Sequence, residues 1–86
     1  MPEVTVYLTR HCPYCVRVKR LLDKKGAAYR TIDVGGDPAL WEEMASRSGR
    51  RTVPQVFIDD RPVGGFDDLV ALDMEGTLDQ LLGIKE

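Results

Sequence analysis

The sequence predicts an α/β fold in which one four-stranded mixed sheet has helices on both faces. Apolar, β-branched segments at residues 4–8 and 28–34 flank an amphipathic helical pattern, and this β–α–β order makes the first two strands parallel. Residues 55–58 and 62–64 form a second pair of strands. The tight turn between them, Asp59-Asp60-Arg61, makes that pair antiparallel.

Proline and glycine mark the ends of the first two helices. Pro13 suits a first helical turn, where its missing N–H costs nothing, and Gly26 ends the helical pattern. Asp37-Pro38 is typical of an N-cap followed by proline at the first helical position. It predicts a second helix that runs to about Ser48-Gly49.

The C-terminal part adds an edge strand and two more helices. Pro62 has no backbone N–H, so its short strand is expected at an edge of the sheet. Asp67-Asp68 is predicted to cap a third helix that runs through Met74. Thr77 is predicted to cap a last short helix.

Length, composition and charge exclude several classes of protein. The 86 residues suit one domain, and the formal net charge of −2 argues against a nucleic-acid-binding module. No apolar run approaches the ~20 residues of a membrane span, and the N-terminus lacks the pattern of a signal peptide. We therefore expect no membrane association and a reducing, cytoplasmic location.

Charge is distributed unevenly along the chain. Residues 1–30 contain seven basic and two acidic side chains, whereas residues 31–86 contain five basic and twelve acidic ones. Most of the basic excess is interpreted as the solvated face of the first helix. Part of it lies beside the cysteine pair, where positive potential favours a thiolate.

The two cysteines are the strongest chemical signal. Cys12 and Cys15 are three residues apart where the first helix begins, so they lie on one face of a helical turn and can form a disulfide. The helix N-terminus favours a thiolate on Cys12, so we expect Cys12 to attack a disulfide and the more buried Cys15 to resolve the intermediate. A CxxC pair can also bind metal or be inert, but its place between strand and helix of a βαβ unit favours redox chemistry. His11 is the only histidine, so the chain lacks the four ligands of a structural zinc site.

Two further motifs have both a structural and a functional interpretation. In Thr52-Val53-Pro54, the proline either starts a strand or forms a cis peptide bond that turns the backbone of Val53 toward the cysteines, ready for a peptide-like ligand. The segment Gly64-Gly65-Phe66-Asp67-Asp68 is either a turn with a helix cap or a pocket. In such a pocket, free N–H groups hold a carboxylate and an aspartate holds an ammonium group.

The motifs closely resemble, in sequence and in order, those of the dithiol glutaredoxins, particularly the short bacterial class: Cys12-Pro13-Tyr14-Cys15, Thr52-Val53-Pro54 and Gly64-Gly65-Phe66-Asp67-Asp68. The resemblance covers Val4 to Leu82 and implies a single domain over residues 1–86 with the thioredoxin fold. It also implies a glutathione-dependent thiol–disulfide oxidoreductase that reduces protein disulfides and glutathione mixed disulfides. Cys12 would be its nucleophile and Cys15 its resolving thiol.

The resemblance further implies a glutathione site. The residue matching Val53 binds the cysteinyl unit through its backbone in that family, and Phe66 stands where many relatives have a cysteine. Thr9 replaces the family's frequent lysine, so Arg10 or Arg51 is expected to contact the glycine carboxylate. The glutathione-binding residues predicted in this way are Arg10, Tyr14, Arg51, Thr52, Val53, Pro54, Gly65, Phe66, Asp67 and Asp68.

Other conspicuous residues have structural interpretations. We expect His11 to face solvent, Trp41 to pack, and Tyr7 and Tyr29 to lie in the core or on a sheet face. Asp59-Asp60 is interpreted as a turn rather than a metal site, and no metal cofactor is expected. The expected partners of a monomer are glutathione and disulfide-containing or glutathionylated proteins, without nucleic acid or membrane.

Two alternative functions remain open. A redoxin reduced by thioredoxin reductase has a similar fold, but Pro13-Tyr14 and Asp67-Asp68 argue against it. An iron–sulfur carrier would bridge a cluster between two monomers through Cys12 and glutathione. Pro13, which stiffens the turn, and the competing thiol of Cys15 argue against that function.

Overall fold

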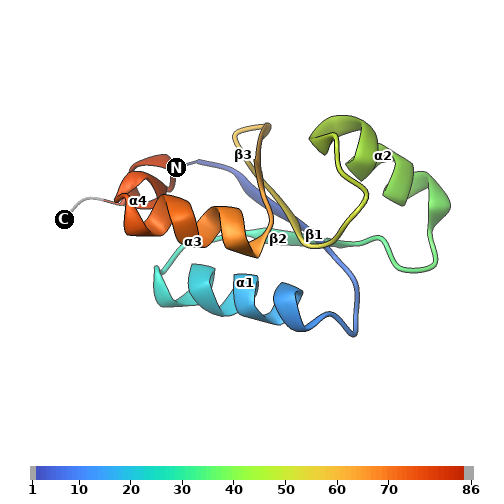
Figure 1. The fold of residues 1–86 in the computed structure, drawn as a ribbon, viewed down its shortest axis with the longest axis horizontal. Helices are drawn as coiled ribbons and strands as arrows, with labels where there is room; N and C mark the ends of the chain where they lie inside the picture. The colour runs from blue at the N-terminus through green and yellow to red at the C-terminus, as the bar shows by residue number, and fades with distance from the viewer. Residues whose placement is uncertain (1, 85–86) are drawn as a thin grey trace.

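The computed structural model describes residues 2–84, which form a mixed sheet surrounded by helices (Figure 1). The elements in chain order are β1 (Val4–Leu8), α1 (Pro13–Lys24), β2 (Arg30–Asp33), α2 (Pro38–Ser48), β3 (Gln55–Ile58), β4 (Arg61–Gly64), α3 (Phe66–Met74) and α4 (Thr77–Leu81). Within residues 2–84, no helix has both the length and the apolar character needed to cross a bilayer.

The sheet has the strand order β2-β1-β3-β4. β1 pairs with β2 in parallel, whereas β1 with β3 and β3 with β4 are antiparallel, which confirms the predicted mixed sheet. Pro62 lies on the edge strand β4, as predicted. β2 is shorter than the strand predicted over residues 28–34, because its pairing with β1 begins only at Arg30, which lies opposite Thr5.

Alternate residues of the central strands build a core on each side of the sheet. Val4 and Val6 of β1, with Val56 and Ile58 of β3, pack against α1, α3 and α4. The other side carries α2, which Figure 1 shows well apart from those three helices. Helices on both faces are therefore confirmed.

The core beneath α2 is built around two aromatic rings. Tyr7 of β1 and Phe57 of β3 are buried, with ring centroids 5.4 Å apart in an edge-on arrangement. Met44 of α2 is buried against them, and the half-buried Trp41 packs on the same cluster, as predicted. These contacts hold α2 on the sheet through apolar burial.

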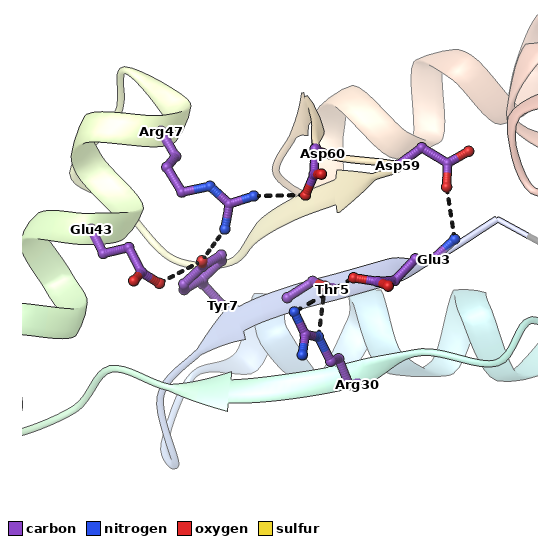
Figure 2. A network of polar contacts seen from close by, with 8 residues as sticks. All are labelled: Glu3, Thr5, Tyr7, Arg30, Glu43, Arg47, Asp59 and Asp60. Atoms are coloured by element: carbon purple, nitrogen blue, oxygen red, sulfur yellow. Dashed lines mark hydrogen bonds and ion pairs between the residues drawn. The ribbon is translucent and has the colours of Figure 1, made fainter.

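A polar network fixes the position of α2 over the sheet (Figure 2). The Tyr7 hydroxyl donates to Glu43 Oε2 at 2.8 Å and accepts from Arg47 Nη1 at 2.6 Å. Burial, followed by the hydrogen bond to Glu43, raises the pKa of Tyr7, so its hydroxyl remains a donor at neutral pH. Arg47 also pairs with Asp60 in the β3–β4 turn at 3.1 Å. This network anchors the start of the segment from residue 49 to residue 54, which leads from α2 into β3.

Most of the predicted helix ends are confirmed, including the Asp37 cap of α2, and the N-terminal ends of α3 and α4 differ from the prediction. α1 ends at Lys24 and is followed by Gly26 at φ +71°, as expected. The prediction that Thr77 caps α4 is wrong: Gly76 holds the cap position at φ +80°, so Thr77 is already helical. α3 begins one residue before Asp67, because Gly65 is its N-cap. Asp68 still contributes to the cap as predicted, since its carboxylate accepts from the Gly65 N–H.

Candidate active site

Cys12 lies at the junction between β1 and α1. It is the N-cap residue of α1, and Pro13 occupies the start of the helix as predicted. The Cys15 backbone N–H donates to Cys12 Sγ at 3.1 Å. A sulfur that receives a main-chain hydrogen bond at a helix N-terminus is placed where negative charge is stabilised.

The two thiols differ in environment. Both are free cysteines, with Cys12 partly exposed and Cys15 only 2% exposed. Burial, and then its contact with Cys12, raises the pKa of Cys15 to about 12. Cys15 is therefore held as a neutral thiol at physiological pH.

This difference predicts selective alkylation. Iodoacetamide at about pH 7.5 should modify Cys12 and leave Cys15 unmodified in the native protein, because the thiolate is the reacting form. Peptide mass spectrometry after a timed quench measures both sites, and urea-unfolded protein is the control in which both should react. Equal labelling of the two cysteines in the native state would contradict the prediction that Cys12 is the nucleophile and Cys15 the resolving thiol.

The loop before β3 lies against Cys12. The Val53–Pro54 peptide bond is cis, which is the functional alternative considered for this motif. The Cys12 thiol faces the carbonyl oxygen of Val53 at 3.9 Å. The backbone of Val53 is thus beside the Cys12 sulfur, where an extended peptide can pair with it.

A hollow of about 260 Å³ is enclosed by the start of α1, the loop before β3 and the start of α3. Eight of the ten predicted glutathione-binding residues line it: Tyr14, Thr52, Val53, Pro54, Gly65, Phe66, Asp67 and Asp68. The structure therefore brings together three motifs that are separated in sequence by up to fifty residues.

The other two predicted residues lie elsewhere. Arg10 is exposed and does not line the hollow, and Arg51 pairs with Glu42 of α2 at 2.9 Å. Two lining residues were not predicted: Arg50, and the buried Gln55, whose side chain donates to Thr52 Oγ1 at 3.2 Å. The only signal for these two residues in the sequence is their polar character and their position close to Thr52-Val53-Pro54.

Asp68 is the most strongly held charge in the hollow. Its Oδ2 accepts from the Gly65 N–H at 2.9 Å and from Arg50 Nη1 at 2.7 Å. The ion pair with Arg50, and then the Gly65 N–H, lower the pKa of Asp68. The Asp68 carboxylate thus stays ionised at the N-terminus of α3. Its two contacts link Arg50, in the loop before β3, to Gly65, at the start of α3.

Two aromatic rings form the outer rim. Tyr14, 51% exposed, lies with its ring centroid 6.1 Å from that of Phe66. The guanidinium carbon of Arg17 is 5.1 Å from the Tyr14 centroid, a cation–π contact. His11 is exposed, as predicted. Among residues 2–84, no group of three or more His, Cys, Asp or Glu side chains is arranged to hold a metal ion.

Comparison with known proteins identifies this arrangement. The model of the family described as Glutaredoxin matches residues 4–63. The chain belongs to the glutaredoxin family. This glutaredoxin is 51% identical over 82 residues to Glutaredoxin 3 of Escherichia coli (strain K12), covering 95% of the chain and 99% of that relative. It is 49% identical over 82 residues to the Glutaredoxin of Pseudomonas aeruginosa, covering 95% and 98% of the two chains.

Solved structures show the same fold. The crystal structure of the buckwheat glutaredoxin–glutathione complex matches with a TM-score of 0.88 at 34% identity, covering 95% of this chain and 77% of that one. The solution structure of glutaredoxin from Brucella melitensis matches with a TM-score of 0.85 at 52% identity, covering 95% and 89%. The predicted thioredoxin fold is confirmed, and the protein is a thiol–disulfide oxidoreductase with Cys12 and Cys15 in its CxxC motif.

Proposed function

We propose that this glutaredoxin uses glutathione to reduce glutathione mixed disulfides and protein disulfides in a reducing compartment such as the cytoplasm. One observation carries the proposal: the hollow beside Cys12 is lined by the backbone of Val53, which lies near the sulfur, and by the carboxylate of Asp68. A tripeptide that carries a thiol at its centre and an ammonium group at one end matches these two groups. The buckwheat relative, solved as a complex with glutathione, supports the same ligand.

The hollow suggests a place for each part of glutathione. The cysteinyl unit pairs with the Val53 backbone, which brings its sulfur to Cys12. The γ-glutamyl ammonium group meets Asp68, and its carboxylate meets the free N–H groups at the start of α3. For the glycine carboxylate, Arg50 joins Arg10 and Arg51 as a candidate cation, because Arg50 lines the hollow.

The chemistry proceeds by thiolate exchange at Cys12. Its thiolate attacks the glutathione sulfur of a mixed disulfide, so that a Cys12–glutathione disulfide forms and the protein thiol leaves. A second glutathione thiolate attacks the glutathione sulfur of that disulfide, which releases oxidised glutathione and restores the Cys12 thiolate. The small, open hollow leaves room for this second attack.

A protein disulfide follows a longer route. Cys12 attacks one sulfur of the substrate and releases the other as a thiolate, which takes up a proton. Cys15 then loses its proton and attacks Cys12, so the reduced substrate leaves and a Cys12–Cys15 disulfide remains. Two glutathione molecules reduce that disulfide, and each gives up one electron and one proton overall.

The Arg50–Asp68 pair allows the glutathione site to be tested. Asp68→Asn should raise the apparent KM for glutathione about tenfold, because it removes the charge that holds the ammonium group. Arg50→Gln should raise it about threefold if Arg50 orients Asp68, a modest effect because both side chains are partly exposed. The double variant should then resemble Asp68→Asn alone, whereas multiplied effects would show that Arg50 contacts glutathione independently.

The same pair gives a pH test. In the wild type Arg50 lowers the pKa of Asp68, so the carboxylate stays charged as the pH falls below its ordinary range. Glutathione affinity should therefore fall at a higher pH in Arg50→Gln than in the wild type. NMR titration with glutathione from about pH 6 to about pH 3 measures this shift. Coincident pH profiles would contradict the role of Asp68 as the ammonium contact.

A further inference from the structure

The solvent-facing side of α1 carries positive charge that the proposed chemistry does not use. Val18 and Leu22 bury one side of the helix. Arg17, Arg20 and Lys24 follow at spacings of three and four residues and are exposed. At 3.6 residues per turn these three lie together on the side opposite the buried residues. They are called the basic stripe below.

In the described part of the chain, the basic stripe gathers three unpaired cations on one side of a single helix, whereas the other cations without an ion pair, Arg10, Lys19 and Arg61, do not belong to it. The side chains of Lys25, Arg30, Arg47, Arg50 and Arg51 each contact a carboxylate. For the basic stripe, no carboxylate among residues 2–84 lies within ion-pair distance. Its charge is therefore not neutralised within the described chain.

The stability of α1 does not explain the basic stripe. Arg17 and Arg20 are three residues apart, and Arg20 and Lys24 are four apart, so like charges are neighbours on the helix surface. Such pairs repel and weaken a helix. Glutamine has nearly the same helix propensity as arginine and lysine, so the helix needs no charge at Arg17 and Arg20. Only Lys24, in the last turn, also favours the helix through the macrodipole.

The basic stripe begins beside the reactive sulfur. Arg17 lies over the ring of Tyr14, which is on the rim of the hollow and two residues from Cys12. From Pro13 to Lys24 the helix extends about 16 Å. That length exceeds the Debye length of about 10 Å at 0.1 M salt but is well below the roughly 30 Å at 0.01 M. Arg17 therefore acts on a molecule at Cys12 at either salt concentration, whereas Lys24 acts on it at low salt or through a substrate flank that lies along the helix.

We propose that the basic stripe is a docking surface for protein substrates whose disulfide is flanked by acidic side chains. The proposal rests on disulfide exchange at Cys12, which brings the residues flanking a substrate disulfide onto the surface around α1. Unneutralised positive charge there favours an acidic flank and speeds its encounter. Nucleic acid fits less well, because residues 31–86 carry a net charge of −7 and repel an extended polyanion.

Single-turnover kinetics test the proposal without any external reductant. Pre-reduced protein is mixed with three disulfide peptides of equal length whose flanking residues are Glu, Gln or Lys, and the second-order rate constant is measured after acid quench. At about 20 mM salt the Glu peptide should react at least about tenfold faster than the Lys peptide. At about 300 mM salt the two rates should approach each other.

Matched variants separate the basic stripe from net charge. Arg20→Gln/Lys24→Gln should remove most of the preference for the Glu peptide. Arg30→Gln/Arg61→Gln, which makes the same charge change on β2 and β4, should preserve it. Thermal unfolding should show that the stripe variant remains folded at the assay temperature, because substitutions at the exposed Arg20 and Lys24 change stability little.

Each other outcome overturns the proposal. Equal rates for the three peptides in the wild type would exclude a charge-selective surface, and equal losses in the two variants would assign the effect to net charge. Micromolar binding of a DNA duplex of about 20 bp, combined with equal peptide rates, would assign the stripe to nucleic acid. Because reduced protein is used, a failure of glutathione as reductant would leave these rates unchanged and would be seen separately in steady-state turnover.

Discussion

Cys12→Ser should reduce turnover of a glutathione mixed disulfide by at least about 10³-fold. A serine hydroxyl ionises far less readily than a thiol and is a poor nucleophile toward sulfur, so neither disulfide exchange can begin. The measurement is steady-state reduction of a small glutathione mixed disulfide with glutathione as reductant. Thermal unfolding near the wild-type temperature should show that the loss is chemical, because Cys12 is only partly buried.

Cys15→Ser is the matched control for this prediction. It should retain most of the turnover of the glutathione mixed disulfide, because that route needs only Cys12. It should lose reduction of protein disulfides by the dithiol route, and the substrate should remain trapped on Cys12 as a mixed disulfide visible by mass spectrometry. Substantial activity of Cys12→Ser, or equal loss in both variants, would show that the roles of nucleophile and resolving thiol are wrongly assigned.

Gly64→Ala should have the largest effect on the hollow without changing any charge. Gly64 has φ +102°, and a Cβ there would collide with the Asp68 carboxylate that accepts from Gly65 and Arg50. Strain and collision together should lower the free energy of unfolding by about 2–4 kcal/mol. The displaced Asp68 should also weaken glutathione binding about tenfold.

Gly36→Ala separates backbone strain from the collision. Gly36 has φ +74° but no atom within 4 Å of the position of a Cβ, so it should lose about 1 kcal/mol of stability and keep its glutathione affinity. Chemical denaturation measures stability, and calorimetry well below the unfolding transition measures affinity. Equal effects of the two substitutions would contradict the proposed link between Gly64 and the shape of the hollow.

Most of the fold could be predicted because local sequence and tertiary structure agree. The βαβ order and the short turn at Asp59-Asp60 determine the strand directions, and Pro62 restricts its strand to an edge. The prediction for Thr77 is wrong because the neighbouring Gly76, in the left-handed region, takes the cap position, and composition alone does not rank the two.

The candidate site shows where sequence patterns reach their limit. Arg50 and Arg51 are adjacent and chemically identical, yet Arg50 meets Asp68 and Arg51 meets Glu42. The path of the chain after α2 decides which arginine faces the hollow. Contacts of Tyr7 with Glu43 and Arg47 help to fix α2 and therefore the start of that path. Long-range contacts of this kind leave no local signal in the sequence.

The choice of reductant tests the central claim most directly. A small glutathione mixed disulfide is offered to the protein with NADPH, first with glutathione and glutathione reductase and then with thioredoxin reductase alone. The site around Cys12, Val53 and Asp68 predicts steady turnover in the first system and at least about tenfold less in the second. Turnover supported by thioredoxin reductase, with none from glutathione, would contradict the proposed function.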